Sequence, residues 1–344
     1  MSAVTRLGLI GGVLTTSAAL AGLSTLPAVR DTLTKHLGPN GVKHTWRLLA
    51  LLVALLNLKN LPGFWHIRVL RGIIYQLYFQ PHPQQPKHLF APMITSSYNT
   101  PYDTDYNFHK SNSTYFADLD VARAHYMGCI IRTGLARLNK GDEQGLPKDT
   151  TEAGGKYFVA LGSISCFFHK QIEPLQRFEI FTRVLSWDRK WLYVVSHIVK
   201  HGAVRPESYA LQPWRKRKAR RQGKGGEQEG DAQDLSKVIF ATSVARYVFK
   251  KGRKTINPEV VLERSRLLPP RPDGVDLPPR TEGTPSDATP APAETPSADD
   301  SWTWDDMEKE RLRGLKIATH FDALSAAQHE LRASEALGQY GDYW

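Results

Sequence analysis

The stretch that decides the fold is residues 103–115, which read D-T-D-Y-N-F-H-K-S-N-S-T-Y. Near its end lie Asn112 and Ser113, which are good N-cap residues for a helix. The apolar residues that follow recur at helical spacing, at Tyr115, Phe116, Leu119, Ala122 and Tyr126. This pattern predicts an amphipathic helix that begins near Asn112 and buries one face.

Strand-like segments lie on both sides of this helix. An extended segment around 90–99 precedes it, and four β-rich segments follow it, at 157–172, 178–187, 191–199 and 238–250. Asp188-Arg189 is typical of a tight hairpin turn between two of these strands. The order of one strand, a helix and four strands predicts an α+β domain over residues 88–258, in which a single antiparallel sheet wraps around a central helix.

Residues 103–115 resemble the entry motif of hotdog-fold thioesterases. In the 4-hydroxybenzoyl-CoA thioesterase-like group this motif reads D-T-D-x-x-G-H-x-N-N-A-x-Y, and six positions match at identical spacing, namely Asp103, Thr104, Asp105, His109, Asn112 and Tyr115. The resemblance covers residues 88–258 and includes 119–123, which is similar to the family's F-E-E-A-R. The A-D-L-D-V-A-R of residues 117–123 and the hydrophobic N-terminus look especially like the thioesterase superfamily member 6 group and the thioesterase-like proteins of fungal secondary-metabolite clusters.

The resemblance implies a hotdog fold, a homodimer and an acyl-CoA or acyl-carrier thioester as substrate, with no cofactor and no metal. It implies that Asp105 is the catalytic carboxylate, as general base or nucleophile. The amides near Asn112 and Ser113 would stabilise the negative charge that develops on the thioester oxygen. His109 and Asp120 are possible supporting residues, and each could equally have a structural role, as a hydrogen-bonded histidine or in a polar contact on the helix.

Two other interpretations stay open at this point. Asp103 and Asp105 suit hydrogen bonds within a turn, and the chain departs from the motif where Phe108 replaces the glycine and Ser111 the first asparagine. The alternative function is therefore a catalytically weak acyl-binding or scaffolding protein at a membrane. A hotdog dehydratase is less favoured, because its motif resembles D-x-x-x-x-H, whereas only three residues separate Asp105 from His109.

The N-terminal part, residues 1–80, is apolar or amphipathic. Leu7–Val29 carries no charge and is long enough to span a bilayer, but its glycines leave a signal peptide or a buried helix open. Leu48–Leu58 is too short to cross a membrane, and Phe64–Phe79 suits either a membrane surface or packing against the domain. We expect residues 1–80 to hold the protein at an intracellular membrane, for instance that of the endoplasmic reticulum or the mitochondrion.

The charge is concentrated in one place. The formal net charge is +11, and six of the basic residues lie within residues 215–221, inside a predicted loop insertion at 215–231. Aromatic residues do not interleave with this run beyond Trp214, so we expect a solvated loop or a contact with anionic lipid rather than with nucleic acid. A mean hydropathy of −0.39 excludes a multi-span membrane protein.

The C-terminal part differs in composition from the domain. Residues 268–301 are crowded with Pro, Ser, Thr, Asp and Glu, which predicts a disordered linker, and residues 302–344 form a tail whose helix should start near Thr303. The chain has only two cysteines, Cys129 and Cys166, so a disulfide framework and a cysteine zinc site are excluded. We expect both cysteines to be small buried apolar side chains.

Overall fold

The computed structural model describes residues 41–80, 84–215, 237–272 and 302–324, together with Pro27, Asp31 and Lys35. The α-helices are α3 (Gly41–Leu56), α4 (Phe64–Ile74), α5 (Asn112–Asn139), α6 (Lys148–Thr151), α7 (Pro258–Arg264) and α8 (Trp304–Ala323). The strands are β1 (Met93–Tyr98), β2 (Tyr157–Phe168), β3 (Arg177–Trp187), β4 (Trp191–Lys200), β5 (Ile239–Lys251) and β6 (Lys254–Ile256). Shorter helical turns are η1 (Leu58–Asn60), η2 (Tyr75–Phe79), η3 (Pro86–His88) and η4 (Pro101–Asp103).

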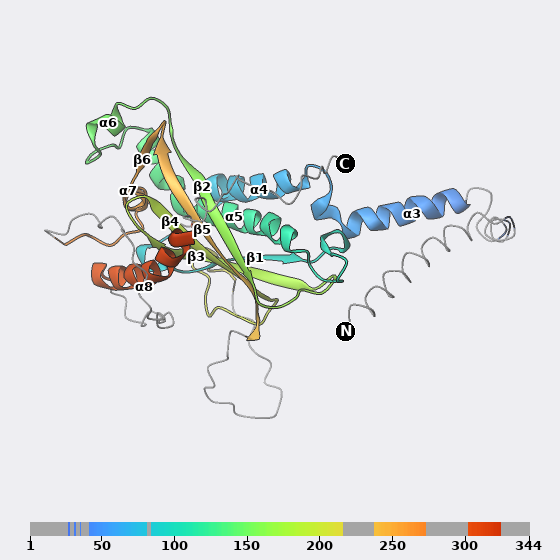
Figure 1. The fold of residues 1–344 in the computed structure, drawn as a ribbon. Helices are drawn as coiled ribbons and strands as arrows, with labels where there is room; N and C mark the ends of the chain where they lie inside the picture. Colours follow the sequence, from blue (N-terminus) through green and yellow to red (C-terminus); the bar gives the residue numbers. More distant parts are fainter. Residues whose placement is uncertain are drawn as a thin grey trace, which may run out of the picture.

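One antiparallel sheet forms the body of the domain. Its main path runs in the order β1-β3-β4-β5-β2, and β6 pairs with β5. The four predicted downstream segments are β2, β3, β4 and β5, and the turn between β3 and β4 is held by Asp188, whose Oδ1 accepts from the amides of Lys190 and Trp191. The sheet curves around α5 (Figure 1), which confirms the hotdog-type α+β fold.

The central helix starts where the sequence predicts. It begins at Asn112 and buries the expected face, including Tyr115, Leu119, Ala122 and Tyr126. The hydroxyl of Tyr126 donates to the Leu89 carbonyl at 3.2 Å and accepts from the Val184 amide at 2.8 Å. These bonds let a polar group lie in the core at little cost, because its donor and acceptor are both paired.

Helix α4 packs directly on α5. A Cβ added at Gly72 would lie 2.6 Å from the His125 ring of α5. One added at Gly128 of α5 would lie 3.3 Å from Gln76 Cβ in η2, so α5 approaches α4 and the adjoining η2 closely at these glycines. Of the two interpretations of Phe64–Phe79, packing on the domain is therefore confirmed for one face. The opposite face leaves Ile67, Leu70 and Ile74 exposed.

Helix α8 covers the other face of the sheet (Figure 1). It begins at Trp304, as predicted, and the Thr303 hydroxyl accepts from the Asp306 amide as an N-cap. A Cβ at Gly314 would lie 1.9 Å from the Leu185 carbonyl oxygen, so only glycine permits this contact. Arg311 of α8 is buried and donates to the Trp187 carbonyl of β3 at 2.9 Å.

Several expectations fall on residues that the structure does not describe. These are most of 7–29, residues 216–231 of the basic loop, residues 273–301 of the Pro-rich segment and the end of the tail from 325. Among the residues that the structure describes, none of the helices has the length and apolar character needed to cross a bilayer.

Candidate active site

A compact loop joins β1 to the start of α5 and carries Asp105. It begins with η4, where the Thr100 side chain accepts from the Asp103 amide in a capping box. A β-bridge between Thr104 and Lys110 then closes a small turn, in which the Asp105 amide donates to the His109 carbonyl at 3.0 Å. The loop is thus closed on itself by local hydrogen bonds before the helix starts.

The Asp105 carboxylate lies at the surface of this turn, with its side chain 23 % exposed. Oδ1 accepts from the Asn107 amide at 2.8 Å and lies 3.7 Å from Nδ1 of His109. Oδ2 has no hydrogen-bond partner in the described parts of the chain. Asp105 therefore makes the turn contact that the structural interpretation expects, and its side chain remains partly exposed.

The backbone conformation of Phe108 explains why the family motif has glycine at this position. Its φ is 61°, in the left-handed region that an L-residue with a Cβ adopts only at a cost of about 1–2 kcal/mol. Its amide donates to the Asp105 carbonyl at 3.0 Å, which closes the turn. Its side chain is 43 % exposed, so burial compensates only part of the strain.

The first turn of α5 supplies unpaired donors beside this loop. Ser111 is the N-cap, but its side chain makes no capping bond to the helix. Within the described residues the amides of Asn112 and Ser113 reach no acceptor, as is normal for the first turn of a helix without a side-chain cap. Such a helix start can hold an anion or a developing negative charge. Tyr115 follows one turn on, and its pKa is raised first by burial and then by the charges of Cys166 and nearby Asp105.

The carboxylate that α5 buries is Asp118, and the sequence interpretation missed it. Asp120, the expected second carboxylate, is partly exposed and pairs with the buried Arg123 on its own helix. Asp118 is 2 % exposed and contacts Lys59, Arg68 and Lys110, which come from three other segments of the chain. No local motif marks such a residue. The only feature of the sequence that indicates its burial is its position on the apolar face of the helix, one residue before Leu119.

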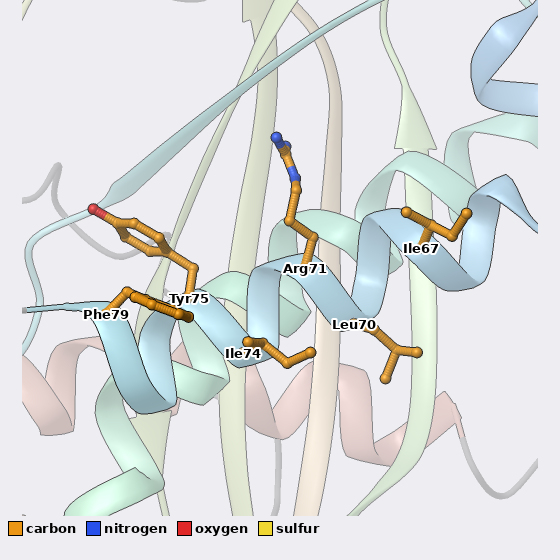
Figure 2. A pocket seen from close by; sticks show the side chains of 6 residues that line it. All are labelled: Ile67, Leu70, Arg71, Ile74, Tyr75 and Phe79. Carbon is orange, nitrogen blue, oxygen red and sulfur yellow. The ribbon is translucent and has the colours of Figure 1, made fainter.

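An apolar pocket of about 440 Å³ lies on the outer face of α4 (Figure 2) and not at Asp105. It is lined by Ile67, Leu70, Arg71, Ile74, Tyr75 and Phe79. None of these residues belongs to the 99–111 loop, so this pocket is separate from the Asp105 turn. Ile74 and Phe79 lie next to one another along this helical segment (Figure 2), and both are exposed.

The remaining titratable candidates do not extend the site. Burial raises the pKa of both Cys129 and Cys166 to about 11, which leaves the thiols protonated and unreactive at neutral pH. Within the described ranges, no three or more His, Cys, Asp or Glu side chains come together as metal ligands would.

Comparison with known proteins gives consistent results. Residues 100–222 match the family model described as "Thioesterase-like superfamily". The chain is 34% identical over 308 residues to the "Probable thioesterase atnL" of Emericella nidulans, covering 84% of this chain and 90% of that protein. It is 32% identical over 309 residues to "Thioesterase poxG" of Penicillium oxalicum, covering 87% and 91%.

Among solved structures, the fold is similar to that of "YbaW Probable Thioesterase from Escherichia coli", at 12% identity, with a TM-score of 0.30, over 51% of this chain and 96% of that one. This likeness is too distant to bear on activity. The two fungal relatives match along nearly their whole length, and the matched family region contains the Asp105 turn and the start of α5. The chain therefore belongs to the thioesterase-like superfamily of hotdog-fold proteins.

Proposed function

We propose that this protein hydrolyses acyl thioesters of coenzyme A or of an acyl carrier, with Asp105 as the catalytic carboxylate. The observation that carries the proposal is the placement of a partly exposed carboxylate on the turn directly before α5, whose amides at Asn112 and Ser113 have no acceptor within the described chain. Thioester hydrolysis needs both features, since one activates or provides the nucleophile and the other stabilises the oxyanion.

The reaction can follow either of two routes from this geometry. As general base, Asp105 takes a proton from a water whose oxygen attacks the carbonyl carbon; the C–S bond then breaks and the thiolate recovers a proton. As nucleophile, the carboxylate displaces the thiolate to form an anhydride, which water then hydrolyses. Both routes yield a carboxylic acid and a thiol.

One observation favours the scaffolding alternative. The Asn107 amide occupies Oδ1 of Asp105, so the carboxylate already has a structural partner. In that case the protein would bind acyl thioesters without cleaving them, and Asp105 would contribute only to the turn.

A thiol-release assay on acyl-CoA substrates of several chain lengths separates the two functions. Asp105→Asn keeps the shape of the side chain, and the amide oxygen can still accept from Asn107. It should lower kcat at least about a hundredfold with little change in KM, because the lost interaction acts in the transition state. Asp149→Asn is the matched control, since Asp149 is an exposed carboxylate that pairs with Lys254. An unchanged kcat in Asp105→Asn disproves its catalytic role, and a parent that binds acyl-CoA without cleaving it supports the scaffold.

The proposal includes a homodimer that pairs through β2. This strand is 12 residues long, and among the strands of the described ranges it pairs only with β5. It exposes Phe158, Leu161, Phe167 and Phe168. A long, apolar sheet edge invites aggregation unless another chain covers it, and a second copy of β2 satisfies the same backbone groups on both chains.

The proposal also places α3 and α4 on an intracellular membrane surface. α3 extends away from the domain (Figure 1), and its described part exposes seven large apolar side chains, Leu48, Leu49, Leu51, Leu52, Val53, Leu55 and Leu56. The sequence contains no Asp or Glu between Asp31 and Asp103, while basic residues such as Arg47 and Arg71 occur there. An apolar surface without acidic residues suits the interface of an anionic bilayer.

A further inference from the structure

Five charged side chains meet inside the protein, beside the Asp105 loop. Two are carboxylates, Asp103 and Asp118, and three are cations, Lys59, Lys110 and Arg68. Lys59 follows α3 in η1, and Arg68 is on α4, so two of the three cations come from outside the stretch that resembles the family. Burying charges this deeply is costly unless each has a close partner.

Asp118 is the centre of this cluster. Its Oδ2 accepts from Lys59 Nζ and from Lys110 Nζ, both at 2.9 Å, and its Oδ1 accepts from Arg68 at 2.6 Å. Burial alone would raise its pKa, but these cations outweigh burial and lower it, so the group is a carboxylate. The Ser97 hydroxyl of β1 also donates to it at 3.1 Å.

The same lysines reach the loop through Asp103. Lys59 Nζ lies 2.6 Å and Lys110 Nζ 3.3 Å from Asp103 Oδ2, while Asn60 Nδ2 donates to Asp103 Oδ1 at 2.8 Å. The Asp103 carbonyl accepts from the Ser111 amide at 2.7 Å. Asp103 is thus tied on one side to η1 and on the other to the N-cap of α5.

Further contacts attach the N-terminal segment to the same loop. Asn60 Nδ2 also donates to Thr100 Oγ1 at 2.8 Å, and the Tyr102 amide donates to Asn57 Oδ1 at 2.7 Å. Residues 57–60 therefore contact the loop at Thr100, Tyr102 and Asp103, the last of which lies two residues before Asp105.

We propose that Lys59 and Asn60 are positioning residues for Asp105, so that the N-terminal segment completes the active site. The inference rests on the proposed function of Asp105. Local hydrogen bonds shape the Asp105 turn, and its orientation relative to α5 is set at Asp103, where the Ser111 amide joins the loop to the helix start. That orientation depends on Asp103, which Lys59 and Asn60 hold against the helix start. A small misplacement of a catalytic group lowers the rate much more than it lowers the stability of the fold.

The test compares two nearly buried lysines. Lys59→Met removes the ammonium group that bridges Asp103 and Asp118. Lys251→Met is the control, because Lys251 is equally buried, at 8% exposure against 9% for Lys59, and pairs with Glu143 at 2.8 Å. Both variants should lose thermal stability. Only Lys59→Met should lower kcat, by at least about tenfold with KM within about twofold, and Lys59→Arg should recover part of the loss.

A second readout does not depend on activity. Hydrogen–deuterium exchange of residues 99–111 should be faster in Lys59→Met and in the milder Asn60→Ala than in the parent, and unchanged in Lys251→Met. The inference is overturned if exchange of this loop is unchanged in both variants, or if their kcat stays within twofold of the parent while Asp105→Asn is inactive. If Asp105→Asn retains full activity, the proposed function fails, whatever the loop does.

Discussion

The guanidinium group of Arg68 on α4 lies 2.6 Å from the Asp118 carboxylate on α5, inside the protein. α4 belongs to the N-terminal segment that the sequence predicts to attach to a membrane, and α5 is the central helix of the hotdog domain. A buried ion pair joins the two, so α4 is a structural part of the domain and cannot serve as a detachable anchor.

Arg68→Met should therefore destabilise the whole fold. Removing one partner of a buried pair typically costs about 3 kcal/mol or more, and here Lys59 and Lys110 retain part of the compensation for Asp118. We expect a loss of about 2–3 kcal/mol in the free energy of unfolding, measured by urea denaturation. Arg137→Met removes a more exposed pair with Asp142 and should cost less than about 1 kcal/mol. Equal losses in the two variants would contradict the structural role of α4.

The second prediction concerns the stability of variants at Phe108, whose backbone is left-handed. Phe108→Gly relieves the strain and Phe108→Ala does not, although both remove the ring. The glycine variant should therefore be more stable than the alanine variant by about 1 kcal/mol, the reverse of the usual order. Arg266, with φ of 59°, is a matched site after α7 where the same order should hold. If Phe108→Ala is the more stable of the pair, the turn does not need the left-handed conformation.

Membrane contact can be tested on α3 without disturbing the domain. Leu52→Glu places a charge on an exposed apolar surface and should reduce binding to vesicles that contain anionic phosphatidylserine by at least about tenfold. Leu312→Glu, at an exposed leucine on α8, should bind like the parent. Flotation of the full chain measures both. Raised salt should weaken the binding of the parent to these vesicles, since its basic residues attract the anionic lipid. Equal binding of the two variants would count against a membrane contact through α3.

The edge strand predicts the oligomeric state. Leu161→Lys puts a charge on the edge strand β2, where Leu161 is exposed and pairs with Tyr247 of β5. It should convert a dimer into a monomer in light scattering after size-exclusion chromatography. Ile317→Lys on α8 is the control, at an exposed apolar residue away from the sheet edge, and should remain dimeric. A parent that is monomeric at micromolar concentration would exclude pairing through β2.

His197 makes stability depend on pH. Its pKa is lowered to about 4, mainly by burial, then by Arg183 and by His169; its Nδ1 lies 3.2 Å from the Thr242 hydroxyl. Because the unfolded chain binds the proton more tightly, with a pKa of about 6.5, stability is full above that pH and falls as the pH drops toward 4. The loss should be at most about 3 kcal/mol.

His197→Gln should flatten this part of the stability profile. Melting temperatures between pH 4 and 7 measure it, with the variant compared with the parent at each pH. His88 and His125, whose pKa values burial also lowers, titrate in both proteins and cancel in the difference. A variant that follows the same slope as the parent would show that His197 is not the group responsible.

The sequence by itself determined the elements and the family. Apolar spacing located α5 and the four long downstream strands, since helix and strand periods are local properties of the chain. The six motif positions at 103–115 indicated the hotdog fold, and the left-handed φ of Phe108 shows why that motif carries glycine. Capping residues also located the start of α8, because an N-cap depends only on its neighbours in sequence.

Only the tertiary structure decided which charges lie inside. Lys59, Arg68 and Lys110 are ordinary basic residues in the sequence. The contacts that pair them with Asp118 span 59, 50 and 8 positions of the chain. It also decided which face of α4 packs on α5 and which carries the apolar pocket, because periodicity identifies an apolar stripe but not its partner. A buried carboxylate is stable only where other segments of the chain place cations beside it, and a local sequence pattern does not predict such contacts.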